Sequence, residues 1–205
     1  MLEDLKKISN QITLVRLSLL PFMWFLILMN YPLYYVGILL IICGVTDVLD
    51  GYLARRLNQV TEIGSRMDSW ADNLLLISAI LWTALRLPEV FTENLPLMLT
   101  ALGFYAVFLL VGAMKFHRFA NLHLYLSKLA TLVAYFFLVH ALLTGIYSRG
   151  FFIFAALISI LSNIEGIATQ LILSQVDEHM GSLIFLYLKK DSPLVLWIKR
   201  LFRDK

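Results

Sequence analysis

The chain has 205 residues, 60% of them hydrophobic and only 15% charged, and its mean hydropathy is +0.80. A soluble domain normally has about a quarter of its residues charged, so this composition excludes an ordinary soluble domain and indicates an integral membrane protein. The net charge of +3 fits the distribution of Lys and Arg in membrane proteins better than it fits nucleic-acid binding. Cys43 is the only cysteine, which excludes an intramolecular disulfide. Because no polar linker or low-complexity segment interrupts the sequence, we expect a single domain over residues 1–205.

Several stretches are long and apolar enough to cross a membrane as helices, which requires about 20 residues each. Polar or proline-containing breaks separate them, and several connections are short, so neighbouring helices should run antiparallel. The predicted fold is therefore an all-α integral membrane protein with six transmembrane helices, bundled over residues 12–174. The predicted spans are 12–30, 33–56, 64–87, 95–114, 122–145 and 150–174.

Both ends of the chain have the pattern of short amphipathic helices that lie in the membrane interface. Leu2, Leu5 and Ile8 recur at helical intervals within residues 1–11. Residues 175–205 end in PLVLWIKRLFRDK, which mixes aromatic and basic residues. Burial of apolar side chains and attraction to anionic lipids would hold such helices at the cytoplasmic surface. Solvated tails are the alternative.

The positions of Lys and Arg predict the orientation, because cytoplasmic loops carry an excess of both residues. If the N-terminus is cytoplasmic, only Arg86 and Arg149 of the 17 Lys and Arg residues fall on the opposite side. This distribution places both termini in the cytoplasm, together with the connection between the second and third spans.

The stretch DVLDGYLARRLNQVTEIGSRMDSWAD, residues 47–72, places aspartates near the ends of two apolar segments. At about 3.6 residues per turn, Asp47 and Asp50 share one face of the second predicted span. By the same spacing, Asp68 and Asp72 share one face of the third. The two helices would therefore aim two pairs of carboxylates at one cytoplasmic cavity, where something positive must offset their repulsion.

The residue types in this stretch suit a metal ion and a phosphate. Carboxylates without His or Cys favour hard cations, so we expect Mg²⁺ or Mn²⁺, and four carboxylates are enough for two ions. Arg55 can hold a phosphate through two hydrogen bonds, and with Arg56 and Arg66 it is expected to supply the offsetting positive charge. Small residues on the carboxylate faces let a bulky ligand approach the backbone, although they also serve helix packing. These small residues are Gly51, Ala54 and Gly64.

The same stretch resembles the signature of the CDP-alcohol phosphotransferase family, D-x2-D-G-x2-A-R-x8-G-x3-D-x3-D, and meets every fixed position. The six-helix layout is also similar to that family. The resemblance implies that Asp47, Asp50 and Asp68 bind metal, and that Asp72 is both a metal ligand and the general base for the acceptor hydroxyl. It also implies a homodimer. The residues that it implies for binding a CDP-lipid are Gly51, Ala54, Arg55, Thr61 and Gly64.

The start of the first span offers further contacts for the nucleotide. Family members tend to have Asn-x-x-Thr followed by Arg here, and this chain has SNQITLVR. By this resemblance, Asn10 and Thr13 are candidate contacts, with Arg16 nearby. Ser9 or Asn10 as an ordinary helix N-cap explains the same residues equally well.

The second half of the chain departs from the pattern of relatives that use a phosphorylated acceptor. Those relatives commonly carry a Gly-Lys-x-Lys-Thr-like stretch between helices four and five, where this chain has KFHRFANLHLYLSKLATL. Lys128 and Glu165 are unusual charges within apolar helices, at the depth of the aspartates. They predict an acceptor pocket, and an ion pair that merely neutralises both charges is the alternative. The predicted pocket residues are Arg118, His123, Lys128, Asn163 and Glu165.

The resemblance, on a membrane protein with this carboxylate cluster, implies a membrane enzyme that transfers a phosphatidyl group from CDP-diacylglycerol to a small hydroxylated acceptor and releases CMP. One alternative is transfer of phosphocholine or phosphoethanolamine from a soluble CDP-alcohol to a lipid alcohol. A different class of function is a metal transporter or a non-catalytic membrane scaffold. Transporters often place their ligands near the membrane midplane in repeated halves, whereas these acidic residues cluster at one end and are not repeated.

Overall fold

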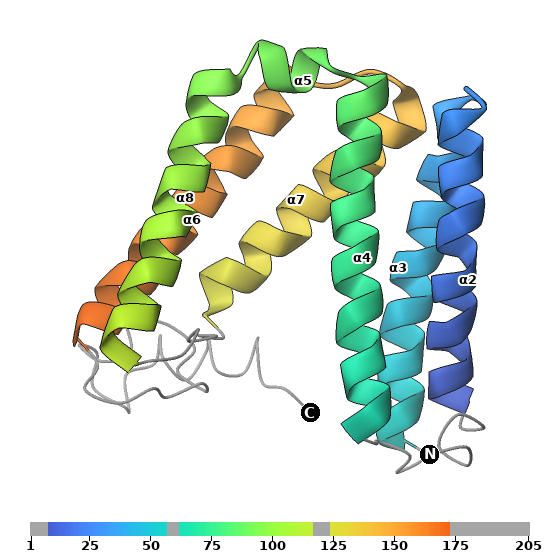
Figure 1. The fold of residues 1–205 in the computed structure, drawn as a ribbon, viewed down its shortest axis with the longest axis horizontal. Helices are drawn as coiled ribbons and strands as arrows, with labels where there is room; N and C mark the ends of the chain where they lie inside the picture. Colours follow the sequence, from blue (N-terminus) through green and yellow to red (C-terminus); the bar gives the residue numbers. More distant parts are fainter. Residues whose placement is uncertain (1–7, 57–61, 117–123, 173–205) are drawn as a thin grey trace, which may run out of the picture. The chain divides into compact units, whose positions relative to one another are not determined.

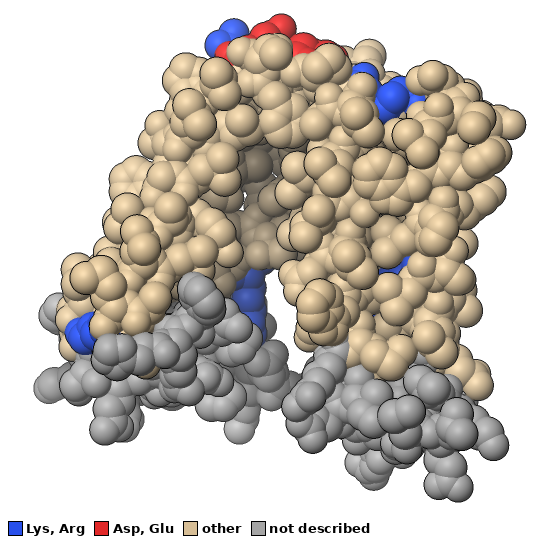
Figure 2. Space-filling model, viewed as in Figure 1, with Lys and Arg blue, Asp and Glu red and all other residues tan. Residues whose placement is uncertain are grey.

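The computed structural model describes residues 8–56, 62–116 and 124–172, and these contain seven helices and no strand. The predicted all-α fold is confirmed. Five of these helices are long and apolar enough to cross a membrane, as expected of an integral membrane protein. Most of the face in Figure 2 is uncharged outside the grey residues. The helices are α2 (Ile8–Leu28), α3 (Leu33–Arg56), α4 (Glu62–Arg86), α5 (Glu89–Thr92), α6 (Leu95–Phe116), α7 (Tyr125–Thr144) and α8 (Arg149–Ile172) (Figure 1).

The helix boundaries agree with the apolar stretches of the sequence. The second predicted span, 33–56, coincides with α3, and the preceding break contains Asn30 with a left-handed φ of 56°. Asparagine tolerates this conformation, which commonly ends a helix. The short helix α5 forms where only a loop was expected. An interfacial helix was predicted over residues 1–11; residues 8–11 instead belong to α2, and residues 1–7 lie outside the described residues. The predicted interfacial segment 175–205 also lies outside them.

Helix α4 differs from the other long helices in where its charges lie. It has 25 residues but is not among the five apolar helices, because Glu62, Arg66, Asp68 and Asp72 all fall in its first half. Residues 73–85 carry no charge. A sixth span formed by α4 therefore stays a prediction.

The contacts within the chain divide it into two compact units. The first unit comprises Met1–Glu93 and Tyr135–Arg149, and the second comprises Asn94–Ala134 and Gly150–Lys205. The division falls within α7, so this helix contributes residues to both units.

In the first unit, α2 packs against both α3 and α4. Trp24 of α2 donates a hydrogen bond from Nε1 to Ser78 Oγ of α4 at 3.1 Å, and its ring meets that of Trp82 edge to face at 5.8 Å. At the end of α4, Arg86 Nη1 donates to the backbone oxygen of Tyr31 at 3.2 Å. This bond occupies a carbonyl just past the end of α2, where the helix itself supplies no donor. These contacts fix α2 and α4 side by side along their length.

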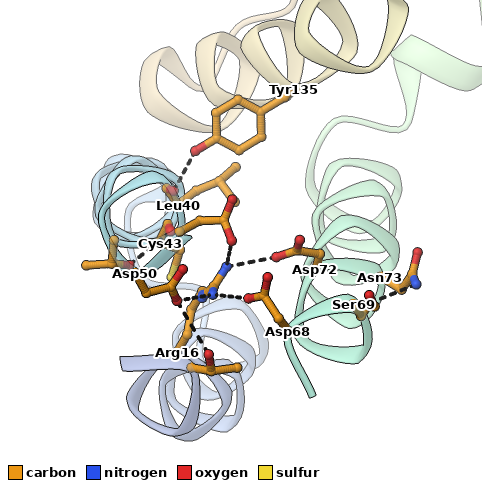
Figure 3. A network of polar contacts seen from close by, with 12 residues as sticks. Arg16, Leu40, Cys43, Asp50, Asp68, Ser69, Asp72, Asn73 and Tyr135 are labelled. Carbon is orange, nitrogen blue, oxygen red and sulfur yellow. Dashed lines mark hydrogen bonds and ion pairs between the residues drawn. The ribbon is translucent and has the colours of Figure 1, made fainter. Parts of the chain in front are cut away.

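The second half of α7 packs on α3 at two glycines. A Cβ atom added to Gly37 would lie 2.6 Å from Leu143 Cα, and one added to Gly44 would lie 2.2 Å from Tyr135 Oη. The Tyr135 hydroxyl donates to the backbone oxygen of Leu40 at 2.7 Å (Figure 3). Because small residues let helices approach closely in a membrane, these glycines hold α3 against α7.

In the second unit, α6 and α8 are in direct contact. The ring of Phe108 lies against Gly166, where an added Cβ atom would be 2.7 Å from the nearest ring carbon. Lys115 Nζ donates to the backbone oxygen of Leu171 at 2.7 Å, in the last turn of α8. A basic side chain at this position satisfies a carbonyl that has no partner within its own helix.

Candidate functional site

The aspartates lie where α3 ends and α4 begins. Asp47 and Asp50 occupy the last turns of α3, and Asp68 and Asp72 occupy the first turns of α4. Residues three or four apart lie on the same face of a helix, so each helix presents one pair. The residue patterns predicted this arrangement, and the structure brings the two pairs together.

The carboxylates form one compact cluster that is open on one side. Oxygens of Asp47, Asp50 and Asp68 lie within 4.8 Å of one another. The Asp50 side chain is only 2% exposed, whereas that of Asp47 is 36% exposed and that of Asp68 37%. Asp72 is the most accessible of the four, at 49%. The cluster therefore has a buried floor at Asp50 and an accessible edge at Asp72.

Arg16 of α2 lies at the centre of this cluster (Figure 3). Its Nη1 donates to Asp47 and, at 2.8 Å, to Asp72. Its Nη2 donates to Asp50 at 2.8 Å and to Asp68 at 2.7 Å. Each terminal nitrogen thus joins one carboxylate of α3 to one carboxylate of α4. A planar guanidinium with fixed donors can form this bridge, whereas a lysine ammonium cannot reproduce its geometry.

The Arg16 side chain is buried, at 2% exposure, and its Nε has no hydrogen-bond partner among the described residues. With all the carboxylates ionised, four negative charges and one positive charge leave this group at a net charge of −3. Concentrated negative charge in an apolar protein is costly unless cations or hydrogen bonds offset it. The net negative charge of the cluster therefore favours the binding of a further cation.

Thr13 lies on the same face of α2 as Arg16 and is also buried. Its hydroxyl donates to Asp50 Oδ2 at 3.4 Å, a long and hence weak hydrogen bond. The predicted nucleotide contact at Thr13 is thus directed at the aspartate cluster, and its role toward a nucleotide stays a prediction.

The remaining residues predicted to bind the CDP-lipid are only partly described. Gly64 is buried in α4, and Gly51 is half-buried in α3, next to Asp50. Both glycines accompany the aspartates, as their spacing predicted. The side chains of Asn10, Ala54 and Arg55 lie outside what the structure describes. Thr61 lies outside it entirely.

The predicted acceptor residues belong to the second unit. Lys128 is exposed on α7, and Asn163 and Glu165 are half-buried on α8. Arg118 and His123 lie outside the described residues. An acceptor pocket formed by these residues stays a prediction, as does the alternative of a Lys128–Glu165 ion pair.

Sequence reasoning noted Arg16 only as lying near the candidate nucleotide contacts and missed its place among the aspartates. The offsetting charge was expected from Arg55, Arg56 and Arg66, and among the described side chains the cation that lies between the aspartates is Arg16. The side chains of Arg55 and Arg66 lie outside what the structure describes, so their contribution stays a prediction. Arg56 instead lies beside Tyr52, with Nη1 3.5 Å from the hydroxyl. The missed signal was a buried charge: an arginine inside the first apolar helix requires an anionic partner.

The donor set fits a divalent cation. Two oxygens bound to the same Mg²⁺ or similar ion lie at most about 4 to 5 Å apart, because metal–oxygen distances are about 2.0 to 2.6 Å. The three clustered aspartates are close to that limit, and hard cations prefer oxygen ligands. Asp47, Asp50 and Asp68 would hold such an ion, with Asp72 at the edge to share a second one.

The chain is similar to enzymes of phospholipid synthesis. The family model of the CDP-alcohol phosphatidyltransferases matches residues 6–163. The CDP-diacylglycerol–glycerol-3-phosphate 3-phosphatidyltransferase of Bacillus subtilis (strain 168) is 39% identical over 36% of this chain and 46% of its own length. The enzyme of the same name from Rickettsia typhi is 28% identical over 62% of this chain and 70% of its own length. A probable cardiolipin synthase (CMP-forming) of Drosophila melanogaster is 31% identical over 58% and 35%.

The chain spans less than half the length of the first relatives it matches, 46% and 42% for the first two. No solved structure matches it. The family match covers most of the chain, including α2, α3 and α4, which together build the cluster of Arg16 and the aspartates. On this match, the chain belongs to the CDP-alcohol phosphatidyltransferase family.

Proposed function

We propose that this protein transfers a phosphatidyl group from CDP-diacylglycerol to a small hydroxylated acceptor, releases CMP, and depends on Mg²⁺ or Mn²⁺. The observation that carries the proposal is the convergence of two aspartates from α3 and two from α4 on one guanidinium. The names of the relatives from Bacillus subtilis and Rickettsia typhi support the reaction class.

The proposed reaction is a displacement at phosphorus. The acceptor oxygen attacks the phosphorus that carries diacylglycerol, the bond from this phosphorus to the CMP oxygen breaks, and CMP leaves with that electron pair. Divalent ions, when bound, would neutralise charge on the diphosphate oxygens. No covalent nucleophile is required, because positioning and electrostatic stabilisation account for most of the catalysis in phosphoryl transfer.

Asp72 is the proposed general base. It is the most accessible carboxylate of the cluster, at 49% side-chain exposure, so an acceptor hydroxyl can reach it. In the reaction it would accept the proton of the attacking hydroxyl. Asp47, Asp50 and Asp68 would hold the ions, which their mutual distances of at most 4.8 Å support, and Asp72 would also share a second ion.

Glycerol 3-phosphate is the first acceptor to test. The relatives named above are glycerol-3-phosphate phosphatidyltransferases. A phosphorylated acceptor needs positive charge, and Lys128 is an exposed cation of the second unit that could supply it. Because the stretch KFHRFANLHLYLSKLATL departs from the pattern of relatives that use a phosphorylated acceptor, serine and inositol are tested beside glycerol 3-phosphate, with inositol phosphate as a second phosphorylated acceptor.

The proposed setting is a six-span membrane protein, and a homodimer, with both termini and the aspartates on the cytoplasmic side. The distribution of Lys and Arg supports this orientation, since only Arg86 and Arg149 fall on the other side. The sixth span would be α4, whose residues 73–85 are free of charge.

The test incubates the purified full chain with CDP-diacylglycerol and Mn²⁺ or Mg²⁺, adding one acceptor at a time. CMP release and the mass of the lipid product are measured. We expect CMP release with one acceptor only, and its loss in EDTA with recovery when the ion is restored. CMP release that EDTA does not affect would contradict the metal dependence. Metal uptake into liposomes without CMP release from any acceptor would instead indicate a transporter.

A further inference from the structure

We propose that Arg16 is a built-in counter-ion, which holds the carboxylates together in the metal-free protein and which divalent cations must displace. The inference rests on the proposed function only in taking the aspartates as the metal ligands. In this inference, Arg16 sets how tightly divalent cations bind, and therefore which of them bind.

The geometry makes the guanidinium and a metal ion competitors. The terminal nitrogens of Arg16 lie 2.7 to 2.8 Å from oxygens of Asp50, Asp68 and Asp72, and Nη1 also bonds to Asp47. The carboxylates that would coordinate an ion are therefore the ones that Arg16 already bridges. A divalent cation among these carboxylates would stand next to a buried positive charge. The two cations repel each other and compete for the same oxygens, so each weakens the binding of the other.

The hydrogen bonds of Arg16 also indicate that its guanidinium can be released from the carboxylates. Both terminal nitrogens are engaged, yet the buried Nε has no partner in the part of the chain that the structure describes. A guanidinium with a purely structural role would be expected to use its third donor position as well, because an unsatisfied buried donor costs free energy. Once released from the carboxylates, the guanidinium keeps its five donors, and these suit the oxygens of a diphosphate.

The energetic consequence is a lower apparent affinity for metal ions. If the carboxylates are bridged by Arg16 for most of the time, the apparent affinity for a cation is lowered by the fraction of protein in the unbridged state. A variant without the guanidinium should bind cations more tightly but should be less stable without them, because the four carboxylates then repel one another unopposed.

The experiment measures Mn²⁺ binding to the chelator-treated full chain by titration calorimetry, with no lipid substrate present. We expect Arg16→Gln to lower the Kd for Mn²⁺ by roughly tenfold or more. We also expect it to lower the Tm in EDTA and to increase the rise in Tm on adding Mn²⁺. The matched control is Arg56→Gln, which removes an exposed positive charge that contacts Tyr52 and sits at the end of α3. Its Kd should stay within about twofold of the unmodified protein, because exposed charges are screened.

An Arg16→Gln protein that binds Mn²⁺ with equal or weaker affinity would overturn the inference, and so would an equal gain in Arg56→Gln. Should Arg16→Gln not fold, Arg16→Lys replaces it, because a single ammonium cannot bridge all four carboxylates. Arg16→Lys should still bind Mn²⁺ more tightly than the unmodified protein, and an unchanged or weaker affinity overturns the inference. Because no substrate is used, failure to release CMP in the separate activity assay leaves this result intact.

Discussion

The Arg16 guanidinium lies 2.8 Å from the Asp72 carboxylate, although 56 positions separate the two residues in the chain. This contact joins α2 to α4, and the other bonds of Arg16 join α2 to α3. Three helices therefore share one ionic centre, and the proposed general base is tied to it.

The first prediction concerns the strength of this contact in the metal-free protein. We expect Arg16→Gln and Asp72→Asn to be non-additive in EDTA, with a coupling of about 0.5 to 3 kcal/mol, because the two groups touch. The measurement is a double-mutant cycle on unfolding in detergent. Arg16→Gln combined with Asn73→Ala is the control, since Asn73 bonds instead to the Ser69 oxygen at 2.8 Å. Additive effects for the Arg16 and Asp72 pair would show that the contact does not contribute.

The second prediction separates catalysis from metal binding. Asp72→Asn should reduce the rate of CMP release by roughly 10² to 10⁴-fold, the usual contribution of a general base, while it weakens Mn²⁺ binding less than Asp50→Asn does. Asp50→Asn should weaken Mn²⁺ binding as well, because Asp50 forms the buried floor of the cluster at 2% exposure. Asn73→Ala should leave CMP release unchanged. An Asp72→Asn protein with normal turnover would rule out Asp72 as the base.

The third prediction tests the packing of α3 on α7. Gly44→Ala should destabilise the protein by about 1 to 3 kcal/mol, because the new Cβ atom would lie 2.2 Å from Tyr135 Oη and 2.8 Å from Tyr135 Cζ. Thermal unfolding in detergent gives the comparison. Gly103→Ala is the control, since nothing lies within 4 Å of its Cβ position.

A second variant tests whether the contact with Tyr135 causes the loss of stability in Gly44→Ala. The cost of Gly44→Ala should be smaller in a Tyr135→Ala background than in the unmodified protein, because that background lacks the ring that the new methyl group meets. An equal cost in both backgrounds would mean that Gly44 matters for another reason, such as the backbone of α3 itself.

The fourth prediction tests whether α4 crosses the membrane. Arg56 ends α3, and Ser148 lies just before α8; α4, α6 and α7 lie between them in the chain. An odd number of spans places the two residues on opposite sides, so Arg56→Cys and Ser148→Cys should react with a membrane-impermeant thiol reagent from opposite sides. The background is Cys43→Ala, which removes the only native cysteine. Labelling of both positions from the same side would show that α4 does not span.

Much of the fold could be predicted from the sequence because membrane helices form locally. A span must satisfy its backbone hydrogen bonds within itself, so an apolar run of sufficient length predicts its own helix, as residues 33–56 did for α3. The helix period likewise placed Asp47 and Asp50 on one face, and Asp68 and Asp72 on another, before any tertiary contact was known. The arrangement of the aspartates could therefore be predicted from their short-range spacing in the sequence.

The tertiary structure decided what those carboxylates meet. Arg16 bonds to Asp47 across 31 positions, and Tyr135 reaches Leu40 across 95. Neither spacing follows from helical periodicity, because contacts between helices depend on how their surfaces pack and not on distance along the chain. The sequence by itself determined the long helices, the aspartate faces and the family. The tertiary structure decided that the buried Arg16 lies among those aspartates. The reason is that α2 packs against both α3 and α4, which places its arginine beside the aspartates of both helices.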